Sequence, residues 1–456
     1  MSFELKKVFC GLFVIGFISG CQTVGGGSSS DVSNNSSLSN PLLVAYADQA
    51  NIVYERALED AKNMQRVLNK FATKPTQDTL NLAQSSWLNA RESYGVSEIF
   101  RLSNGPIDAE EGWVASAYGA PEGQLNAWPL DENMIDYTID ASGRKTTGNI
   151  IENAGLFNPG GNASEPVDVT QITANALASL NENGGDANVA SGYHAIEFLL
   201  WGQDQDYADF SQDNVTPGAL VAGQRPITDF TTDQYAARRL QYLQAAAELL
   251  VSDLEPIAGA WKLELQGSNC AANAGGCYRA ALLGQLTGAD AELNIAQNAA
   301  LRQIVSGMGV FIKSELANER IAVAVLTPSE EDEHSCFSDN THRDISLNYQ
   351  GFVNVLKGSV DGQSFGQSFY RSASTDTQLK ISVLIKKIDA RIAQMNDLAE
   401  NKWHFDYQIL PGNNDVNIRR MKNDMRKLGD MMVVVASDIG VDLSTDDVTD
   451  PEETLL

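Results

Sequence analysis

The stretch GYHAIEFLLWG, residues 192–202, places one histidine and one carboxylate inside an otherwise apolar run. Apolar residues on every side predict a helix that is buried nearly all round. His194 and Glu197 are three residues apart, so they share one face of that helix and can bind one cation together. A lone buried charge is very costly, so the pair needs a partner or a metal. The alternative is that the two side chains form a hydrogen bond with each other, which satisfies their buried polar groups and has only a structural role.

Helical periodicity runs through most of the 456 residues, and the alternation typical of strands is scarce. The fold class that this pattern predicts is all-α, with two tandem helical bundles as the simplest architecture. We expect an N-terminal helical domain over 41–225, which contains the 192–202 helix, and a C-terminal helical domain over 226–456. Long helices are predicted near 42–71, 80–100, 235–261, 290–318, 342–357, 377–398 and 415–438.

Acidic residues outnumber basic ones by 59 to 32, which gives a formal net charge of −27. Such a surface repels nucleic acid and anionic headgroups, so nucleic acid is not an expected partner. It gathers cations weakly, which is consistent with metal handling but more often marks a soluble exported protein. No apolar run is long enough to span a bilayer.

The first twenty residues read as a targeting segment. Lys6 and Lys7 precede the short apolar run 8–17, and the segment ends in ISGC at 18–21, which looks like a bacterial lipobox. That resemblance implies cleavage before Cys21, lipidation of its sulfur and a flexible tether over 21–40. We therefore expect a lipid-anchored protein of the cell envelope, in the outer membrane and facing the periplasm or the cell surface.

Three cysteines remain in the expected mature chain. Cys270 and Cys277 bracket a short flexible loop, and an exported protein meets an oxidising compartment, so a local disulfide is predicted. Cys336 is then the odd one, either a buried thiol or a soft metal ligand.

A charged pair stands near the end of the second predicted helix. Glu98 and Arg101 lie one turn apart there. They either line the same pocket as His194 or form an ordinary ion pair on a bundle surface, worth a few tenths of a kcal/mol.

Residues 104–165 are rich in glycine and proline, and only a short helix near 134–139 is predicted in them. Long irregular segments in helical proteins often cross a functional site. Asp131 and Trp128 are therefore candidates for lining the site, although Trp128 equally suits a packed turn. A further helix near 169–180 is predicted before the 192–202 helix.

The stretch 327–342 combines a capping box at 327–330 with an acidic run that reaches His334. A short helix starting there would put Glu331 and His334 three residues apart, as a mirror of the first pair. For Glu331 a solvated helix N-terminus is the preferred interpretation. Glu333 and His334 stay open as site residues. His404 lies in an aromatic-rich junction, which favours a packing role.

Several strings resemble one known family. Gly192, His194 and Glu197 form the Gly-x-His-x-x-Glu signature of the imelysin-like proteins. The strings NAWPLDE at 126–132, ELANER at 315–320 and EDEHSCFSDNTH at 331–342 are similar to the iron-regulated protein A branch of that family. The resemblance covers roughly residues 42–440. It implies two helical, bundle-like domains with the signature helix near their interface, and a role in bacterial iron uptake at the cell envelope.

The resemblance also implies that the helix of Glu98 lies near the signature helix, which makes Glu98 a further candidate metal ligand beside His194 and Glu197. Imidazole and carboxylate ligands suit iron and zinc alike. We therefore expect an inter-domain site that binds iron or an iron complex, with zinc as the alternative metal.

Some members of that family are classed as metallopeptidases, but the residues here support this activity poorly. An inverzincin needs His-x-x-Glu-His, and Phe198 stands where the second histidine belongs. A third zinc ligand would have to come from Glu98, Asp131 or His334, and the general base would still be missing. A zinc-dependent peptidase is thus an alternative hypothesis. A non-catalytic scaffold that docks to an outer-membrane receptor or transporter is another.

Overall fold

Helices dominate the computed structural model, which describes residues 39–140, 142–204, 222–267, 269–326 and 333–451. The predicted all-α fold class is confirmed. Strands in the described residues form only two-residue hairpins: β1 (Leu156–Phe157) with β2 (Val167–Asp168), and β3 (Ser359–Val360) with β4 (Gln363–Ser364). The expected signal segment, Cys21, most of the tether, the capping box 327–330 and Glu331 lie outside the described residues.

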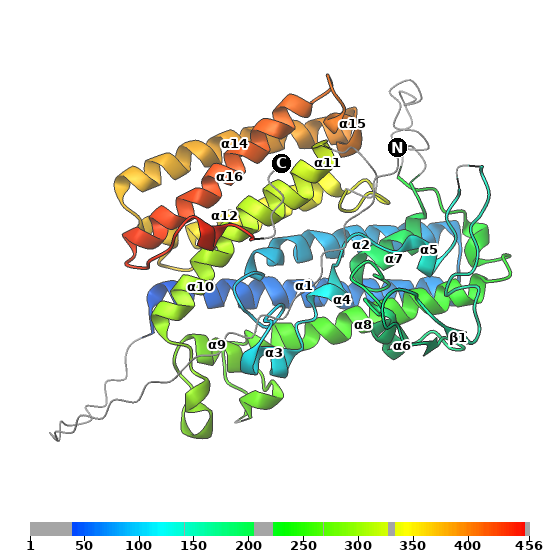
Figure 1. Cartoon of the computed structure of the whole chain (residues 1–456), viewed down its shortest axis with the longest axis horizontal. Coiled ribbons are helices and arrows are strands. Elements are labelled where there is room, and N and C mark those ends of the chain that lie inside the picture. Colours follow the sequence, from blue (N-terminus) through cyan, green and yellow to red (C-terminus); the bar gives the residue numbers. More distant parts are fainter. Residues whose placement is uncertain (1–38, 141, 205–221, 268, 327–332, 452–456) are drawn as a thin grey trace. The chain divides into compact units, whose positions relative to one another are not determined.

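Three long helices form one layer of the core (Figure 1). α1 (Pro41–Thr73) packs along α2 (Gln77–Ser97) on one side and α8 (Ala236–Ala260) on the other. The Asn40 side chain accepts a hydrogen bond from the Leu42 amide and so caps the start of α1. Thr76 and Thr79 form a reciprocal capping box at the start of α2.

A second group of helices packs around α16 (Asp415–Asp438), which contacts α14 (Thr375–Asn401) and the continuous run 297–326. That run comprises α10 (Gln297–Val310), the π-helical segment η5 (Phe311–Ala322) and α11 (Val323–Leu326). It begins and ends later in the chain than the predicted helix near 290–318, whose first residues belong to the 3-10 helix η4 (Gly288–Leu293).

Helix α12 (Thr341–Lys357) packs against α2. A Cβ at Gly351 would lie 2.5 Å from the Val96 carbonyl oxygen, so only glycine permits this close approach. Both α8 and α12 follow residue 225 and pack on helices that precede it. The predicted domain boundary at 225 stays a prediction.

Short elements fill the loops between the long helices. The predicted helix near 134–139 is observed only as α5 (Glu132–Ile135), because Asp136 adopts an extended backbone conformation. The predicted helix near 169–180 begins at Ala174, where the Thr173 side chain caps α6. These elements are η1 (Glu98–Phe100), α3 (Gly112–Tyr118), α4 (Glu122–Leu125), α5, α6 (Ala174–Leu180), α7 (Gly192–Trp201), η2 (Ile227–Phe230), η3 (Cys270–Ala272), α9 (Cys277–Leu282), η4 (Gly288–Leu293), α13 (Phe369–Ser372), α15 (Phe405–Ile409) and η7 (Asp446–Val448).

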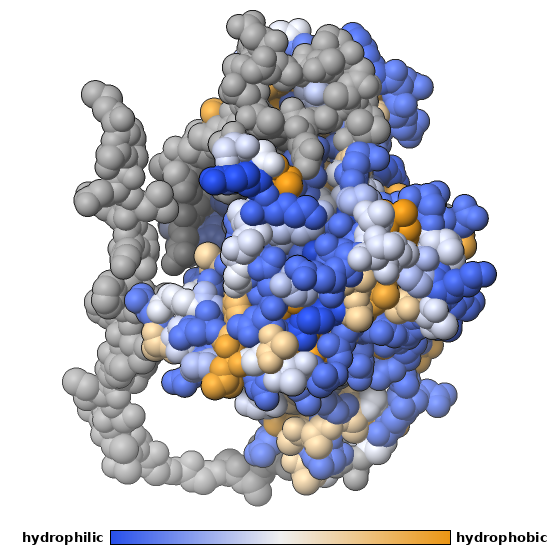
Figure 2. Space-filling model, turned by 90° about the vertical axis from the view of Figure 1, so that its right-hand side faces the viewer, coloured by the Kyte–Doolittle hydropathy of each residue, from blue (hydrophilic) through white to orange (hydrophobic). Residues whose placement is uncertain are grey.

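The exposed surface is largely polar on the face that Figure 2 shows, with scattered hydrophobic residues. None of the described helices combines the length and the apolar character that a membrane span requires. Cys270 and Cys277 are joined by a disulfide bond, and Cys336 is a buried thiol.

Candidate metal centre

Helix α7 is buried along its whole length and begins at Gly192. Gly192 has a φ of 81°, and a Cβ there would lie 2.4 Å from the Leu125 carbonyl oxygen. Glycine therefore lets α7 start directly against α4. His194 in the first turn of α7 and Glu197 in the second both lie in the core, where neither side chain is exposed.

A second histidine faces the first. His194 Nε2 lies 3.3 Å from His334 Nε2, and the two rings meet edge to face with their centroids 4.5 Å apart. Among the described residues, each Nε2 has the other as its only hydrogen-bonding neighbour. We call His194 and His334 the imidazole pair. His334 comes from the turn before α12, so the pair joins segments 140 residues apart.

Each imidazole is held from behind by a carboxylate. His194 Nδ1 lies 2.9 Å from Glu197 Oε2, and His334 Nδ1 lies 2.9 Å from Asp344 Oδ2. Both Nε2 atoms therefore point into the space between the rings. Two nitrogen ligands of one metal ion lie roughly 3.0–3.4 Å apart, given metal–nitrogen bonds of about 2.0–2.2 Å. The observed spacing fits one ion held by both rings.

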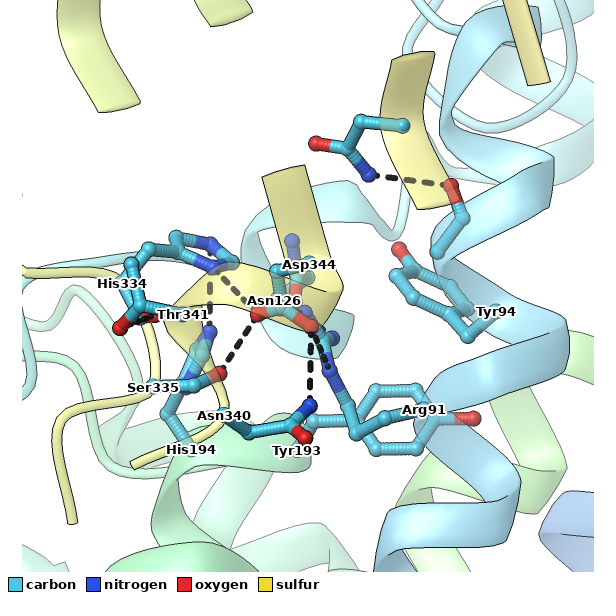
Figure 3. Close-up of polar contacts among 12 residues, drawn as sticks. Arg91, Tyr94, Asn126, Tyr193, His194, His334, Ser335, Asn340, Thr341 and Asp344 are labelled. Carbon is cyan, nitrogen blue, oxygen red and sulfur yellow. Dashed lines mark hydrogen bonds and ion pairs between the residues drawn. The ribbon is translucent and has the colours of Figure 1, made fainter. Parts of the chain in front are cut away.

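The two carboxylates are themselves held in place. Glu197 Oε1 accepts hydrogen bonds from the Ser338 amide at 3.0 Å and from the Ser338 hydroxyl at 2.6 Å. Asp344 Oδ2 accepts from Ser335 Oγ at 2.6 Å and from Arg91 Nη2 at 2.7 Å (Figure 3). Carboxylates placed behind ligating histidines fix the ring orientation and raise the basicity of the ligand.

Burial keeps both imidazoles neutral. Burial lowers the pKa of His194 well below its usual value, and the neighbouring His334 and Arg91 lower it further. For His334, burial has the same effect on the pKa, followed by the charges of Arg320 and Arg91. The neutral imidazole is the form that binds a metal.

The pKa of Glu197 shifts in the opposite direction, upward. Burial raises the pKa of Glu197 to about 8, although Ser338 donates to its carboxylate. A protonated Glu197 donates to His194 Nδ1, which leaves the His194 proton on Nε2 and directs it at His334 Nε2. His334 then donates from Nδ1 to Asp344. These proton positions are inferred from the partners, and they satisfy every ring nitrogen of the pair.

Trp128 covers one side of the imidazole pair. Its ring centroid lies 4.8 Å from that of His194, 6.1 Å from His334 and 5.7 Å from Phe337. An indole in this position shields the pair from solvent. Trp128 therefore lies next to the imidazole pair, and its role in lining a functional site stays a prediction.

Glu98 lies beside the imidazole pair in a separate group of charges. Glu98 Oε2 accepts from Arg320 Nη2 at 2.6 Å and from Asn126 Nδ2 at 3.2 Å, and Arg101 Nη1 lies 3.7 Å from it. Glu315 contacts the same two arginines. We call Glu98, Arg101, Glu315 and Arg320 the arginine–glutamate cluster.

The arginines decide the ionisation of this cluster. Burial raises the pKa of Glu98, but the charges of Arg320 and Arg91 outweigh that effect and lower the pKa below its usual value. Arg101 and Arg320 likewise overcome burial at Glu315 and lower its pKa to about 2. Glu98 is therefore an ionised carboxylate with its charge already compensated, and its role as a metal ligand stays a prediction.

Two other predicted residues lie outside the immediate centre. Asp131 caps α5 by accepting a hydrogen bond from the Met134 amide at 3.0 Å. Glu333 is buried and accepts from the Thr341 hydroxyl at 3.1 Å. The structure thus brings His194, Glu197, Trp128 and His334 together.

Asp344, Arg91 and Asn126 complete the centre, and the sequence analysis did not place them there. Arg91 contacts both Asp344 and Asn126 Oδ1, so it links the imidazole pair to the arginine–glutamate cluster. One signal was available for two of these residues. Asp344 and Arg91 each stand on the buried stripe of an amphipathic helix, where a charged side chain calls for an explanation.

A cavity of about 520 Å³ opens beside His334 and Trp128. Five carboxyl groups and two guanidinium groups line it. The charged lining residues are Arg101, Glu122, Glu182, Asp186, Glu315, Glu319 and Arg320. Carboxyl groups outnumber guanidinium groups in this lining, which favours the entry of a cation over that of an anion.

Comparisons with known proteins agree with the fold. The sequence profile of the imelysin family (peptidase M75) matches residues 51–430. A crystal structure from Parabacteroides distasonis ATCC 8503, of a protein that carries the name of an iron-regulated protein A precursor, superposes with a TM-score of 0.57 at 16% identity. The match covers 89% of this chain and 97% of the other. No curated protein matches this chain.

Proposed function

The chain belongs to the imelysin family, and we propose that it binds one iron ion between His194 and His334 as part of bacterial iron uptake. The observation that carries this proposal is the 3.3 Å separation of the Nε2 atoms of two neutral imidazoles, each of which has a carboxyl group on its Nδ1 side. The name carried by the structural neighbour, an iron-regulated protein A precursor, supports iron over other metals with the same ligand preference.

The cavity beside His334 favours a hydrated cation over an anionic iron chelate. Its carboxyl groups outnumber its guanidinium groups, and the arginines Arg101 and Arg320 are already paired with Glu98 and Glu315. Two histidines leave further coordination positions, which water or a small neutral ligand in the cavity would fill. The proposed cargo is therefore the metal ion with its water.

Metal binding at this centre releases a proton. In the metal-free arrangement, the proton of His194 lies on Nε2 and points at His334. An ion bound to this Nε2 would take the place of that proton, and the Glu197 proton would move onto His194 Nδ1. The pair gives up one proton for each ion bound.

We further propose that lipidation at Cys21 holds the protein at the cell envelope, facing the periplasm or the cell surface from the outer membrane. An outer-membrane receptor or transporter is the expected protein partner. Replacement of Cys21 by serine should release the protein into the soluble fraction and abolish labelling with a fatty-acid analogue. Membrane retention of that variant would contradict the anchor.

The zinc-dependent peptidase is the second candidate, because the family is classed with the peptidases. Catalytic zinc takes three protein ligands and one open position. In the described part of the chain, the contacts of the two Nε2 atoms supply two such ligands. This donor set fits binding better than hydrolysis.

Metal analysis of the full chain tests the proposal. Protein stripped with chelator and then loaded with Fe²⁺ under argon should hold one more equivalent of iron than the His194→Ala/His334→Ala variant. His342→Ala is the matched control, because His342 Nδ1 faces the Asp339 carbonyl and lies outside the pair. Equal iron content in wild type and double variant would contradict the proposal.

Two further assays separate iron uptake from the alternatives. A strain that lacks the protein should grow poorly when iron is scarce, and the wild-type gene should restore growth where the double variant does not. Chelator-sensitive peptide hydrolysis that zinc restores would favour the peptidase. Restoration of growth by the double variant would favour the scaffold.

A further inference from the structure

A second group of metal-ligating side chains lies outside the centre described above. Asp339 belongs to the turn before α12, His404 directly precedes α15, and Asp406 lies in the first turn of α15. One ligand atom from each of the three lies within 4.8 Å of the other two. We call these residues the Asp339–His404–Asp406 cluster.

The contact between Asp339 and His404 is unusual. Asp339 Oδ2 lies 2.6 Å from His404 Nδ1, yet neither buried atom takes part in an aligned hydrogen bond with a described residue. The two side chains are only 10% and 15% exposed. A buried carboxylate oxygen without an aligned donor is costly. If the two atoms moved apart by less than about 1 Å, both could bind one cation, and that cost would be removed.

The surroundings of Asp339 add negative charge. Asp406 is 3% exposed and contributes a second carboxylate to the cluster. His342 contacts the Asp339 carbonyl oxygen at 3.2 Å.

We propose that Asp339, His404 and Asp406 bind a second divalent transition-metal ion. One imidazole and two carboxylates suit Mn²⁺, Fe²⁺ or Zn²⁺. Ser338 holds Glu197 of the first centre, and its neighbour Asp339 belongs to the second, so one short turn carries groups of both. This second site stands independently of the imidazole pair, since it shares no ligand with it.

The test uses the full chain with the first centre removed. The His194→Ala/His334→Ala variant, stripped of metal and titrated with Zn²⁺ alone, should still bind one equivalent. Adding Asp339→Asn or His404→Gln should weaken that binding by more than the roughly 10–100-fold that loss of an outer-shell partner costs. Adding Glu292→Gln, which removes an exposed charge elsewhere, should leave the binding unchanged.

Co²⁺ gives a readout that needs no further substitution. Bound to the double variant, Co²⁺ should produce a visible absorption band, and Zn²⁺ should remove that band by competition. Loss of binding in a variant is interpreted only if its circular dichroism spectrum matches that of the parent, which shows that the variant is folded. Asp406→Asn is used in place of any variant that does not fold. Absence of Zn²⁺ and Co²⁺ binding to the double variant would overturn the proposal, as would binding that these substitutions leave unweakened.

Discussion

The imidazole pair is buried, and Arg91 links it to the arginine–glutamate cluster, in which Glu98 and Arg320 are buried and Arg101 and Glu315 are partly exposed. The two groups offset the cost of burying polar side chains in different ways. In the cluster, glutamates stay ionised because arginines compensate their charge. In the pair, burial keeps both imidazoles neutral. A cluster that is already compensated gains little from a cation, whereas two facing nitrogens gain two metal bonds. The comparison therefore separates a rigid support from a binding centre.

Replacing Glu98 by glutamine should give the largest effect. The substitution leaves Arg320 and Arg91 buried without their shared counter-charge. Breaking a buried ion pair in this way typically costs about 3–5 kcal/mol. Urea unfolding followed by circular dichroism measures the loss. A change below about 1 kcal/mol would show that the cluster does not depend on Glu98.

The next effect is the pH dependence that His334 confers on stability. Its folded-state pKa lies well below the usual value of about 6.5, so below pH 6.5 the unfolded chain binds a proton that the folded chain does not. The stability that neutral His334 contributes is complete above pH 6.5 and is lost as the pH falls. Metal-free wild type should therefore lose about 1.4 kcal/mol more per pH unit than His334→Asn between pH 6 and 5.

Urea unfolding of both proteins in chelator at several pH values measures this difference. His342→Asn serves as a positive control, because burial lowers the pKa of His342 to about 4 and wild type should therefore lose more stability than this variant as well. Parallel pH profiles for wild type and His334→Asn would mean that His334 titrates normally in the folded protein.

Metal affinity should also depend on pH. Because one proton leaves for each ion, the association constant should rise about tenfold per pH unit, or about 1.4 kcal/mol. The rise should level off near pH 8, where Glu197 loses its proton. Calorimetry in buffers of different ionisation enthalpy counts the protons released. An affinity that is constant between pH 6 and 7.5 would contradict the proton positions assigned to the pair.

The smallest effect is expected at the rim of the cavity. Asp186 is exposed and lines the cavity beside His334. Asp186→Asn should slow metal association a few-fold at low ionic strength, and the difference should vanish in high salt because screening removes long-range attraction. Stopped-flow kinetics measures the rate. A salt-independent difference would point to a direct contact instead.

Local patterns predicted the helices well. Helix α16 spans 415–438 and α12 spans 341–357, nearly as the apolar periodicity indicates, because that signal depends on neighbours a few residues away. The contact between His194 and Glu197 follows from the same local spacing. The bounds of the short helices were harder to predict, because residues with an extended backbone, such as Asp136, interrupt a sequence pattern that is typical of a helix.

The rest of the centre depends on contacts that no local pattern contains. His334 reaches His194 because the turn after it reverses direction, with Ser335 at a φ of 71°. Asp344 then lies behind His334 across that turn. Glu98 shows the same limit, because spacing cannot reveal that Arg320, 222 residues away, compensates its charge.

A crystal structure of the iron-loaded full chain, with anomalous data collected at the iron absorption edge, would locate the ion. We predict a peak about 2.0–2.2 Å from both His194 Nε2 and His334 Nε2, with Glu197 and Asp344 still on the Nδ1 atoms. A peak bound by Glu98 and its neighbours, with the two imidazoles still in contact with each other, would contradict the assignment of the imidazole pair as the metal centre.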